Sequence, residues 1–179
     1  MTIKNHFRIM TEFFEREQFE YGLIGAFALY AYGYTRATRD VDFITRIENQ
    51  PKIVCYLESL GFETLHRSEG FSNHLHSLEK MRIDLVYVAG ETARTIFQAT
   101  RKMLVFAELM LPVVSPEHLV ILKLFAIHND PSRKFKELGD IKEVFQRTAM
   151  DTEAMRKHFA KYGLEEFYDE ITKDIDKQG

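Results

Sequence analysis

The first half of the chain alternates between helical and strand-like hydrophobic patterns. Residues 4–18 place aromatic and apolar side chains at helical spacing, which predicts an amphipathic helix. The apolar run 21–24 favours a short strand, and Gly25 marks a sharp turn before a predicted short helix over 26–34. Residues 40–44 carry β-favouring side chains and predict the next strand.

The same alternation continues to about residue 114. Pro51 suits the first turn of a helix, and Gly61 falls just after its last apolar position. The later elements that the pattern predicts are strands 62–66, 74–78 and 82–88, a helix over 91–100, and strands 103–107 and 111–114. We therefore expect an α/β (α+β) fold, with a mixed sheet flanked by helices.

The pattern becomes wholly helical at Ser115. Ser115 can cap a helix, Pro116 suits the first helical position, and Glu117 complements the positive end of the helix dipole. This change predicts two parts: an α/β core over residues 1–114, and a C-terminal helical segment over residues 115–179 that packs on the core.

Composition narrows the class of protein. A chain of 179 residues, 45% of them hydrophobic, can bury one sizeable core. No apolar run approaches the length of a membrane span, and residues 1–10 carry no signal-peptide pattern. The net charge of −3 argues against a general electrostatic grip on nucleic acid. The single cysteine, Cys55, excludes an internal disulfide and suits a reducing compartment, so we expect a cytoplasmic protein. Cys55 also lies on an apolar helical stripe, which predicts a small core residue.

Three aspartates are the candidates for chemistry. Asp40 and Asp42 are two residues apart on a predicted strand, so their side chains share one face of the sheet. Asp84 lies in another apolar strand, and the three carboxylates converge if the two strands are neighbours. Carboxylates suit Mg²⁺, and a site of this kind can hold two ions for phosphoryl transfer. An Asp-x-Asp pair alone is more typical of a solvated strand edge; the third aspartate and the Gly25 turn favour a metal site.

Two ordered motifs carry a resemblance to a known family. Leu23-Ile24-Gly25-Ala26 followed by Arg36-x-Thr38-x-Asp40-x-Asp42 resembles the signature of the polymerase-β-type nucleotidyltransferase superfamily. The runs Ser115-Pro116-Glu117-His118-Leu119 to Lys123-Leu124 and Lys136-Glu137-Leu138-Gly139-Asp140-Ile141 are similar to the second half of its small bacterial members. Those members are the AbiEii-type abortive-infection toxins and the minimal nucleotidyltransferases. The chain departs from the family at Ala26, where a glycine or serine is usual, and at Glu137, where an aspartate is usual.

The resemblance implies a reaction and a set of site residues. Asp40, Asp42 and Asp84 would bind Mg²⁺ or Mn²⁺, with two ions expected, while an NTP donates its NMP to an acceptor hydroxyl and pyrophosphate is released. The nucleotide-binding residues that it implies are Gly25, Ala26, Arg36, Thr38, Lys123 and Asp140.

The residues by themselves leave several of these roles open. Lys123 lies in a helix that is apolar nearly all round, so it either snorkels to water or reaches a buried anion. The resemblance favours a phosphate as that anion. Arg36 could position phosphates or pair with Asp40. Asp140 could hold Lys123 or be a plain surface acid.

The acceptor and the biological role also stay open. A tRNA or other RNA, a protein hydroxyl and a small molecule all suit such a core. The alternative from another class is a non-catalytic nucleotide- or partner-binding component of a toxin–antitoxin-like pair, which would bring an antitoxin-like protein partner. A metal-dependent phosphohydrolase would use the same three carboxylates.

Overall fold

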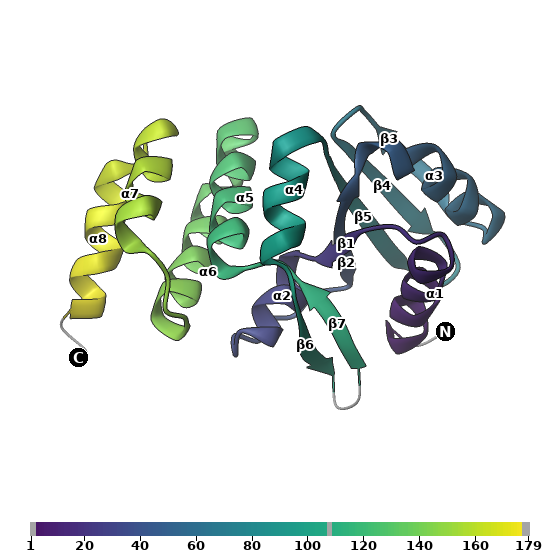
Figure 1. Ribbon diagram of the computed structural model, residues 1–179, viewed down its shortest axis with the longest axis horizontal. Helices are drawn as coiled ribbons and strands as arrows, with labels where there is room; N and C mark the ends of the chain where they lie inside the picture. Colours follow the sequence, from purple (N-terminus) through teal and green to yellow (C-terminus); the bar gives the residue numbers. More distant parts are fainter. Residues whose placement is uncertain (1–2, 107–108, 177–179) are drawn as a thin grey trace. The chain divides into compact units, whose positions relative to one another are not determined.

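The computed structural model describes residues 3–106 and 109–176, and the chain divides into two compact units (Figure 1). The first unit comprises the chain up to Ala28 together with Thr35–Val114, and the second comprises Leu29–Tyr34 together with the chain from Ser115 onward. The elements of the first unit are α1 (Ile3–Arg16), β1 (Tyr21–Leu23), β2 (Asp40–Arg46), η1 (Ile47–Asn49), α3 (Gln50–Ser59), β3 (Glu63–Arg67), β4 (Phe71–His76), β5 (Met81–Val88), α4 (Gly90–Ala99), β6 (Arg101–Phe106) and β7 (Leu109–Val113).

All seven strands form one mixed sheet in the order β3-β4-β5-β2-β1-β7-β6. The strand β2 lies at its centre, parallel to β5 and antiparallel to β1. Because β2 and β5 are neighbours with long matching registers, the residues that alternate along them reach the same two faces. The sheet is therefore the scaffold that decides which polar side chains meet.

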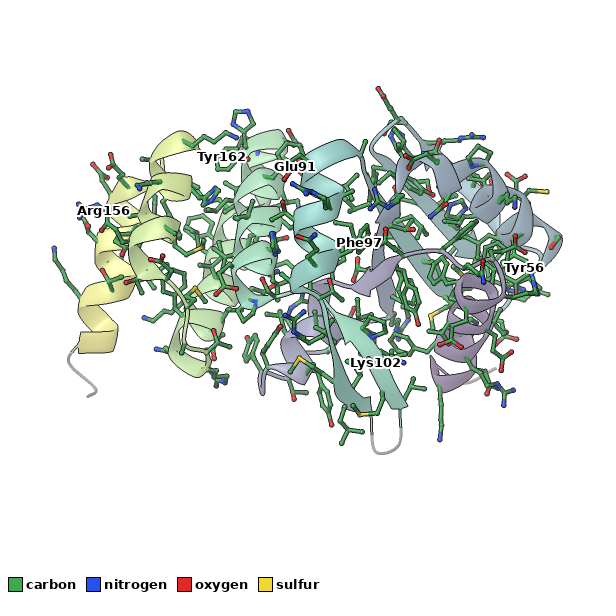
Figure 2. All side chains as sticks on the ribbon, in the orientation of Figure 1. Tyr56, Glu91, Phe97, Lys102, Arg156 and Tyr162 are labelled. Carbon is green, nitrogen blue, oxygen red and sulfur yellow. The ribbon has the colours of Figure 1, made fainter. Side chains whose placement is uncertain are left out.

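The helices α1 and α3 cover one face of this sheet, as Figure 1 shows. The aromatic side chains at helical spacing in α1 explain its position, because Phe7 and Phe14 both pack edge-on against Phe43 of β2. Phe13 stacks on Tyr56 of α3, which is labelled in Figure 2, and their ring centroids are 3.9 Å apart. These contacts bury the odd-numbered side of β2.

The helix α4 lies over the opposite face. Arg46 lies on the even-numbered side of β2, and its guanidinium is 5.6 Å from the ring centroid of Phe97. Phe97, which is labelled in Figure 2, belongs to α4. Ile44 is fully buried on the same side. Asp40 and Asp42 continue that side beyond Ile44 and are only half-buried. One end of the even-numbered side therefore keeps access to solvent.

The second unit is helical. Its elements are the end of α2 (Gly25–Ala31), then α5 (Pro116–Asn129), η2 (Pro131–Arg133), α6 (Lys134–Arg147), α7 (Thr152–Lys161) and α8 (Glu165–Asp176). Ser115 caps α5 by accepting a hydrogen bond from the backbone N–H of His118, as its position predicts. Among the helices that the structure describes, none is long and apolar enough to cross a membrane.

The predicted mixed α/β architecture is confirmed, and two local predictions are wrong. The strand predicted over 74–78 is β4 at Phe71–His76, because the chain turns after His76 and leaves Leu78 91% exposed. Cys55 is exposed, whereas α3 buries its neighbours Ile53, Val54 and Leu57. The last residue of the predicted strand 103–107 lies outside the described residues.

Candidate active site

Gly25 and Asp42 lie in direct contact at the start of α2. Gly25 has a φ of +66°, and a Cβ on it would lie 2.1 Å from Asp42 Oδ2. The backbone N–H of Ile24 also donates to the carbonyl of Asp42 at 3.0 Å. Only glycine combines this backbone conformation with such a close approach, so the turn brings α2 onto the Asp42 carboxylate.

The three aspartates of the sequence analysis share one face of the sheet. In the parallel register of β2 and β5, Asp42 lies opposite Asp84, and Asp40 lies opposite Arg82. All four residues are half-buried. Thus the structure brings the two strands together as expected, and it adds a cation, Arg82, to the same face.

Asp84 has a specific environment of its own. Asn73 lies opposite it in the antiparallel register of β4 and β5, and the Asn73 side-chain amide donates to Asp84 Oδ1 at 2.6 Å. Arg82 Nε lies 3.5 Å from the same oxygen. That nitrogen is buried and finds no hydrogen-bond acceptor among the residues that the structure describes. Asp84 therefore faces two donors within the protein.

The carboxylates suit a metal chemically but are not gathered as a finished centre. Within residues 3–106 and 109–176, no three His, Cys, Asp or Glu side chains are arranged to hold a metal ion. Asp40, Asp42 and Asp84 nevertheless offer the hard oxygen ligands that Mg²⁺ prefers, on adjacent strands and one face. A change of side-chain rotamer is enough to alter which carboxylate oxygens face one another.

The first unit also contains Ala26, Arg36 and Thr38, which are predicted to bind the nucleotide. Ala26 is buried in the first turn of α2, and Arg36 is half-buried. The Thr38 hydroxyl accepts a hydrogen bond from the Asp40 backbone N–H at 3.1 Å. Thr38 therefore fixes the backbone at the entry of β2, next to the Asp40 carboxylate.

Lys123 and Asp140 belong to the second unit, where they contact each other. The Lys123 ammonium is buried and donates to Asp140 Oδ2 at 2.6 Å and to Glu137 Oε2 at 2.8 Å. Arg133 pairs with the other oxygen of Glu137 at 2.6 Å. Burial alone would raise the pKa of Glu137, but the charges and hydrogen bonds of Lys123 and Arg133 outweigh it and lower that pKa. Lys123 thus reaches buried carboxylates and does not snorkel to water.

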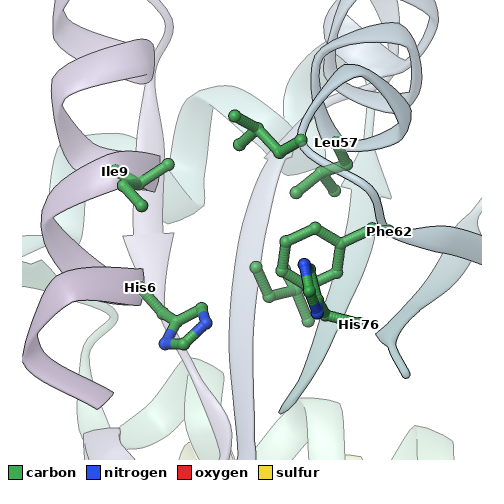
Figure 3. Close-up of a pocket in the computed structure, with 7 residues that line it drawn as sticks. His6, Ile9, Leu57, Phe62 and His76 are labelled. Atoms are coloured by element: carbon green, nitrogen blue, oxygen red, sulfur yellow. The ribbon is translucent and has the colours of Figure 1, made fainter. Parts of the chain in front are cut away.

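A small apolar cavity lies on the other face of the sheet. It has a volume of about 60 Å³ and lies between α1, α3 and the strands, with His6, Ile9, Leu57, Phe62, His76 and Ile83 in its wall (Figure 3). Nucleotide-sized ligands occupy pockets of roughly 300–1,000 Å³. Because Ile83 alternates with Asp84 along β5, this cavity opens away from the carboxylates.

Asn73 and Arg82 are the site residues that the sequence analysis missed. Arg82 could have been found, because it alternates with Asp84 on β5 and so must share its face. Asn73 could not, because the predicted strand began at residue 74 and left it in a loop. Placing Asn73 requires the register of β4 on β5, which the sequence pattern does not give.

Comparison with known proteins supports the fold. No protein-family model matches the chain, and no curated protein matches it. Among solved structures, it is similar to the lincosamide antibiotic adenylyltransferase LnuA with lincomycin bound, at a TM-score of 0.58 and 17% identity, over 83% of this chain and 99% of that chain. It is also similar to ANT(2")-Ia in complex with adenylyl-2"-tobramycin, at a TM-score of 0.62 and 12% identity, over 95% of this chain and 97% of that chain.

A third similar structure is an antigenic nucleotidyltransferase-like protein from Paracoccidioides brasiliensis. Its TM-score is 0.50 at 12% identity, over 76% of this chain and 72% of that chain. At these identities the likeness establishes the fold: the chain has the mixed α/β fold of nucleotidyltransferases. The similarity to these solved structures therefore confirms the expected fold class.

Proposed function

We propose that this protein is a metal-dependent nucleotidyltransferase that moves an NMP from an NTP to an acceptor hydroxyl. The observation that carries the proposal is the register of β2 on β5, which sets Asp42 opposite Asp84 and Asp40 one step away on the same face. The close contact between Gly25 and Asp42 supports it, because it joins the glycine turn to this face. The fold that the chain shares with nucleotidyltransferases is further support for the proposed activity.

Asp40, Asp42 and Asp84 would hold Mg²⁺, or Mn²⁺, with two ions expected. The metal would neutralise charge on the phosphates and on the oxygens that enter and leave the reacting phosphorus. Asp84 would orient the acceptor hydroxyl and accept its proton. The acceptor oxygen then forms a bond to the α-phosphorus, the bond from that phosphorus to the bridging oxygen breaks, and pyrophosphate leaves with the bonding electrons.

The nucleotide would lie against the glycine turn. The backbone of Gly25 and Ala26 would contact its phosphates, with Arg36 adding positive charge and Thr38 holding the entry of β2. For Lys123 and Asp140 we propose a different role from phosphate binding. Since the Lys123 ammonium already donates to Asp140 and Glu137, it holds α5 to α6.

A small hydroxylated molecule is the acceptor that we would test first. Two of the similar structures contain lincomycin and adenylyl-2"-tobramycin, which are small molecules of this kind. The net charge of −3 disfavours RNA as an acceptor. The test below nevertheless includes RNA and protein hydroxyls as alternative acceptors. The AbiEii-like role with an antitoxin-like partner rests on the sequence resemblance, and the cytoplasmic location rests on the single cysteine.

The test is transfer of label from each α-labelled NTP, in the presence of Mg²⁺, to a cell extract and to lincomycin and tobramycin. We expect a labelled product with the wild-type protein and at least about a hundredfold less with Asp42→Asn, which keeps the side-chain size but removes a metal ligand. The matched control is Asp169→Asn, since Asp169 pairs with Arg156 on α7 and should not affect transfer.

Three outcomes would contradict the proposal. Equal transfer by Asp42→Asn would exclude the carboxylates as the site. Absence of transfer together with absence of Mg²⁺-NTP binding by calorimetry would favour the non-catalytic, partner-binding alternative. Release of inorganic phosphate in place of pyrophosphate would identify a phosphohydrolase.

A further inference from the structure

The carboxylate of Asp84 is contacted by side chains of its own sheet. Asp42 contacts the Gly25 backbone, whereas Asp84 meets two side-chain donors from its own sheet, Asn73 and Arg82. Both donors approach the same oxygen, Oδ1. A hydrogen bond of 2.6 Å to a carboxylate is at the short end of the range, where such bonds are strongest.

Arg82 is the second part of this arrangement. It lies on the same face as the aspartates, opposite Asp40 in the register and two residues from Asp84. Its side chain is 41% exposed, yet its Nε is buried, lies 3.5 Å from Asp84 Oδ1 and makes no hydrogen bond within the described part of the chain. A buried donor without a full hydrogen bond is costly, so Arg82 gains from keeping Asp84 close.

These contacts decide how a cation could reach the Asp84 carboxylate. The strands place Asp42 and Asp84 directly opposite each other, so the backbone is already in position. The side chain of Asp84 is nevertheless engaged by Asn73 and Arg82. A cation that binds Asp84 Oδ1 therefore competes with both donors for that oxygen.

We infer that Asn73 and Arg82 form a clamp, the Asn73–Arg82 clamp, that engages Asp84 Oδ1, so that a cation binds this oxygen only by displacing the two donors. The inference rests on the proposed function, because it assumes that the three carboxylates bind a metal ion. It makes Asn73 and Arg82 positioning residues that act through Asp84. It also means that part of the metal-binding free energy is spent on opening the clamp.

The clamp makes an unusual prediction about affinity. Side chains that support a metal ligand normally strengthen binding, so their removal weakens it about 10–100-fold. Here the loss of either clamp residue should tighten binding, because Asp84 becomes available and, for Arg82, a nearby positive charge disappears. We expect about threefold tighter binding for Asn73→Ala and about tenfold for Arg82→Gln. Arg82→Lys keeps the charge but loses the buried Nε, and should fall between wild type and Arg82→Gln.

The experiment titrates the purified full-length protein with Mn²⁺ and follows the unbound ion by electron paramagnetic resonance. Arg94→Gln is the matched control, because it removes the same charge from α4, where Arg94 pairs with Glu91. Thermal melting of every variant checks that each is folded. A second set places Asn73→Ala and Arg82→Gln in an Asp84→Asn background. There the effect of Asn73→Ala should vanish, whereas Arg82→Gln should keep only its direct charge effect.

The outcomes separate the clamp from the proposed function. Tighter Mn²⁺ binding by Asn73→Ala and Arg82→Gln, but not by Arg94→Gln, would support the clamp. Unchanged or weaker binding in both variants would overturn it and leave the metal site of the proposed function standing. If neither the wild type nor any variant binds Mn²⁺, with or without NTP, the proposed function fails together with the clamp.

Discussion

Position 25 has no room for a side chain, because Asp42 Oδ2 lies where a Cβ would be. The positive φ of Gly25 adds a second penalty for any other residue. Gly70 offers a natural comparison, since a Cβ there would meet nothing within 4 Å and its backbone is in an ordinary conformation. Because the two glycines differ in their surroundings, replacing each with alanine tests whether the contact with Asp42 requires glycine at position 25.

We predict that Gly25→Ala lowers the free energy of unfolding by about 1–3 kcal/mol, from backbone strain and from displacement of Asp42. Gly70→Ala should change it by less than about 0.5 kcal/mol. Urea unfolding followed by circular dichroism measures both. Equal stability of the two variants would show that the contact between Gly25 and Asp42 does not exclude a side chain at position 25.

At this scale the sequence predicted some of the candidate site and missed the rest. Asp40, Asp42 and Asp84 follow from strand alternation, and Gly25 follows from its place between a strand and a helix. Asn73 does not, because β4 begins at Phe71, three residues earlier than the predicted strand. Local spacing identifies residues on one strand, but partners across strands depend on register.

The pair of helices α5 and α6 depends on buried charge. Lys123, Glu137 and Asp140 are each at most 5% exposed, and the Lys123 ammonium holds both carboxylates. Breaking such a network by removing one member costs far more than replacing all its charges. The resemblance of this segment to the nucleotidyltransferase superfamily points to Lys123, but periodicity alone leaves the partner of Lys123 open.

We predict that Lys123→Met destabilises the protein by about 3–5 kcal/mol, because two carboxylates stay buried without their cation. The triple variant Lys123→Met, Glu137→Gln, Asp140→Asn should recover most of that loss. Lys136→Met, at an exposed lysine of α6, is the control and should be nearly neutral. Thermal and urea unfolding measure all three; a single variant as stable as the control would refute the network.

The same network predicts a pH dependence. The folded-state pKa of Glu137 lies below its ordinary value of 4.5, so the unfolded chain binds a proton at Glu137 more readily than the folded chain does. Its stabilising contribution is therefore complete above about pH 4.5 and is lost as the pH falls through the lower folded value. Melting temperatures from pH 6 to pH 3 should fall less steeply for Glu137→Gln than for wild type. Parallel curves of melting temperature against pH would show that Glu137 does not contribute to the pH dependence of stability.

The strand β4 contains a second titrating group, on the face away from the aspartates. His74 is fully buried, 2.8 Å from Ser72 Oγ and 3.1 Å from Thr64 Oγ1. Its burial lowers the pKa of His74 to about 4, from an ordinary value of 6.5. Between these values the unfolded chain binds the proton and the folded chain does not, so stability rises with pH across this window.

We predict that the free energy of unfolding of the wild type falls by about 2 kcal/mol more than that of His74→Gln between pH 7 and pH 4.5. Glutamine can still donate and accept a hydrogen bond but does not titrate. Urea unfolding at four pH values within the window measures the difference. Equal slopes for the two proteins would place the acid sensitivity elsewhere.

Across the whole molecule, the chain passes between the two units three times. It leaves the first unit after Ala28, returns at Thr35 and leaves again after Val114. The sequence pattern predicts the change at residue 115 but not the excursion over 29–34. Residues 29–34 belong to the single helix predicted after the turn at Gly25, so the pattern shows no break there. A residue far along the chain contacts this excursion. Arg147 of α6 donates to the Gly33 carbonyl at 3.2 Å.

We predict that Arg147→Ala raises amide hydrogen exchange in residues 29–34, since it removes this hydrogen bond and the contact of the guanidinium with Tyr34. Mass spectrometry of the exchanged peptides measures the change. Arg156→Ala, which removes an arginine of α7 that pairs with Asp169, is the control. Unchanged exchange in 29–34 would show that other contacts hold the segment.

The register across four strands has a consequence for how this protein can vary between species. Asp42, Asp84, Asn73 and His66 lie opposite one another in turn on β2, β5, β4 and β3. Gain or loss of one residue inside β2, β4 or β5 would turn every side chain beyond it to the other face, whereas the pairing of β3 already shifts register between Thr64 and His66. We therefore expect homologous genes to differ in length within the turns between these strands and to keep the strands at constant length.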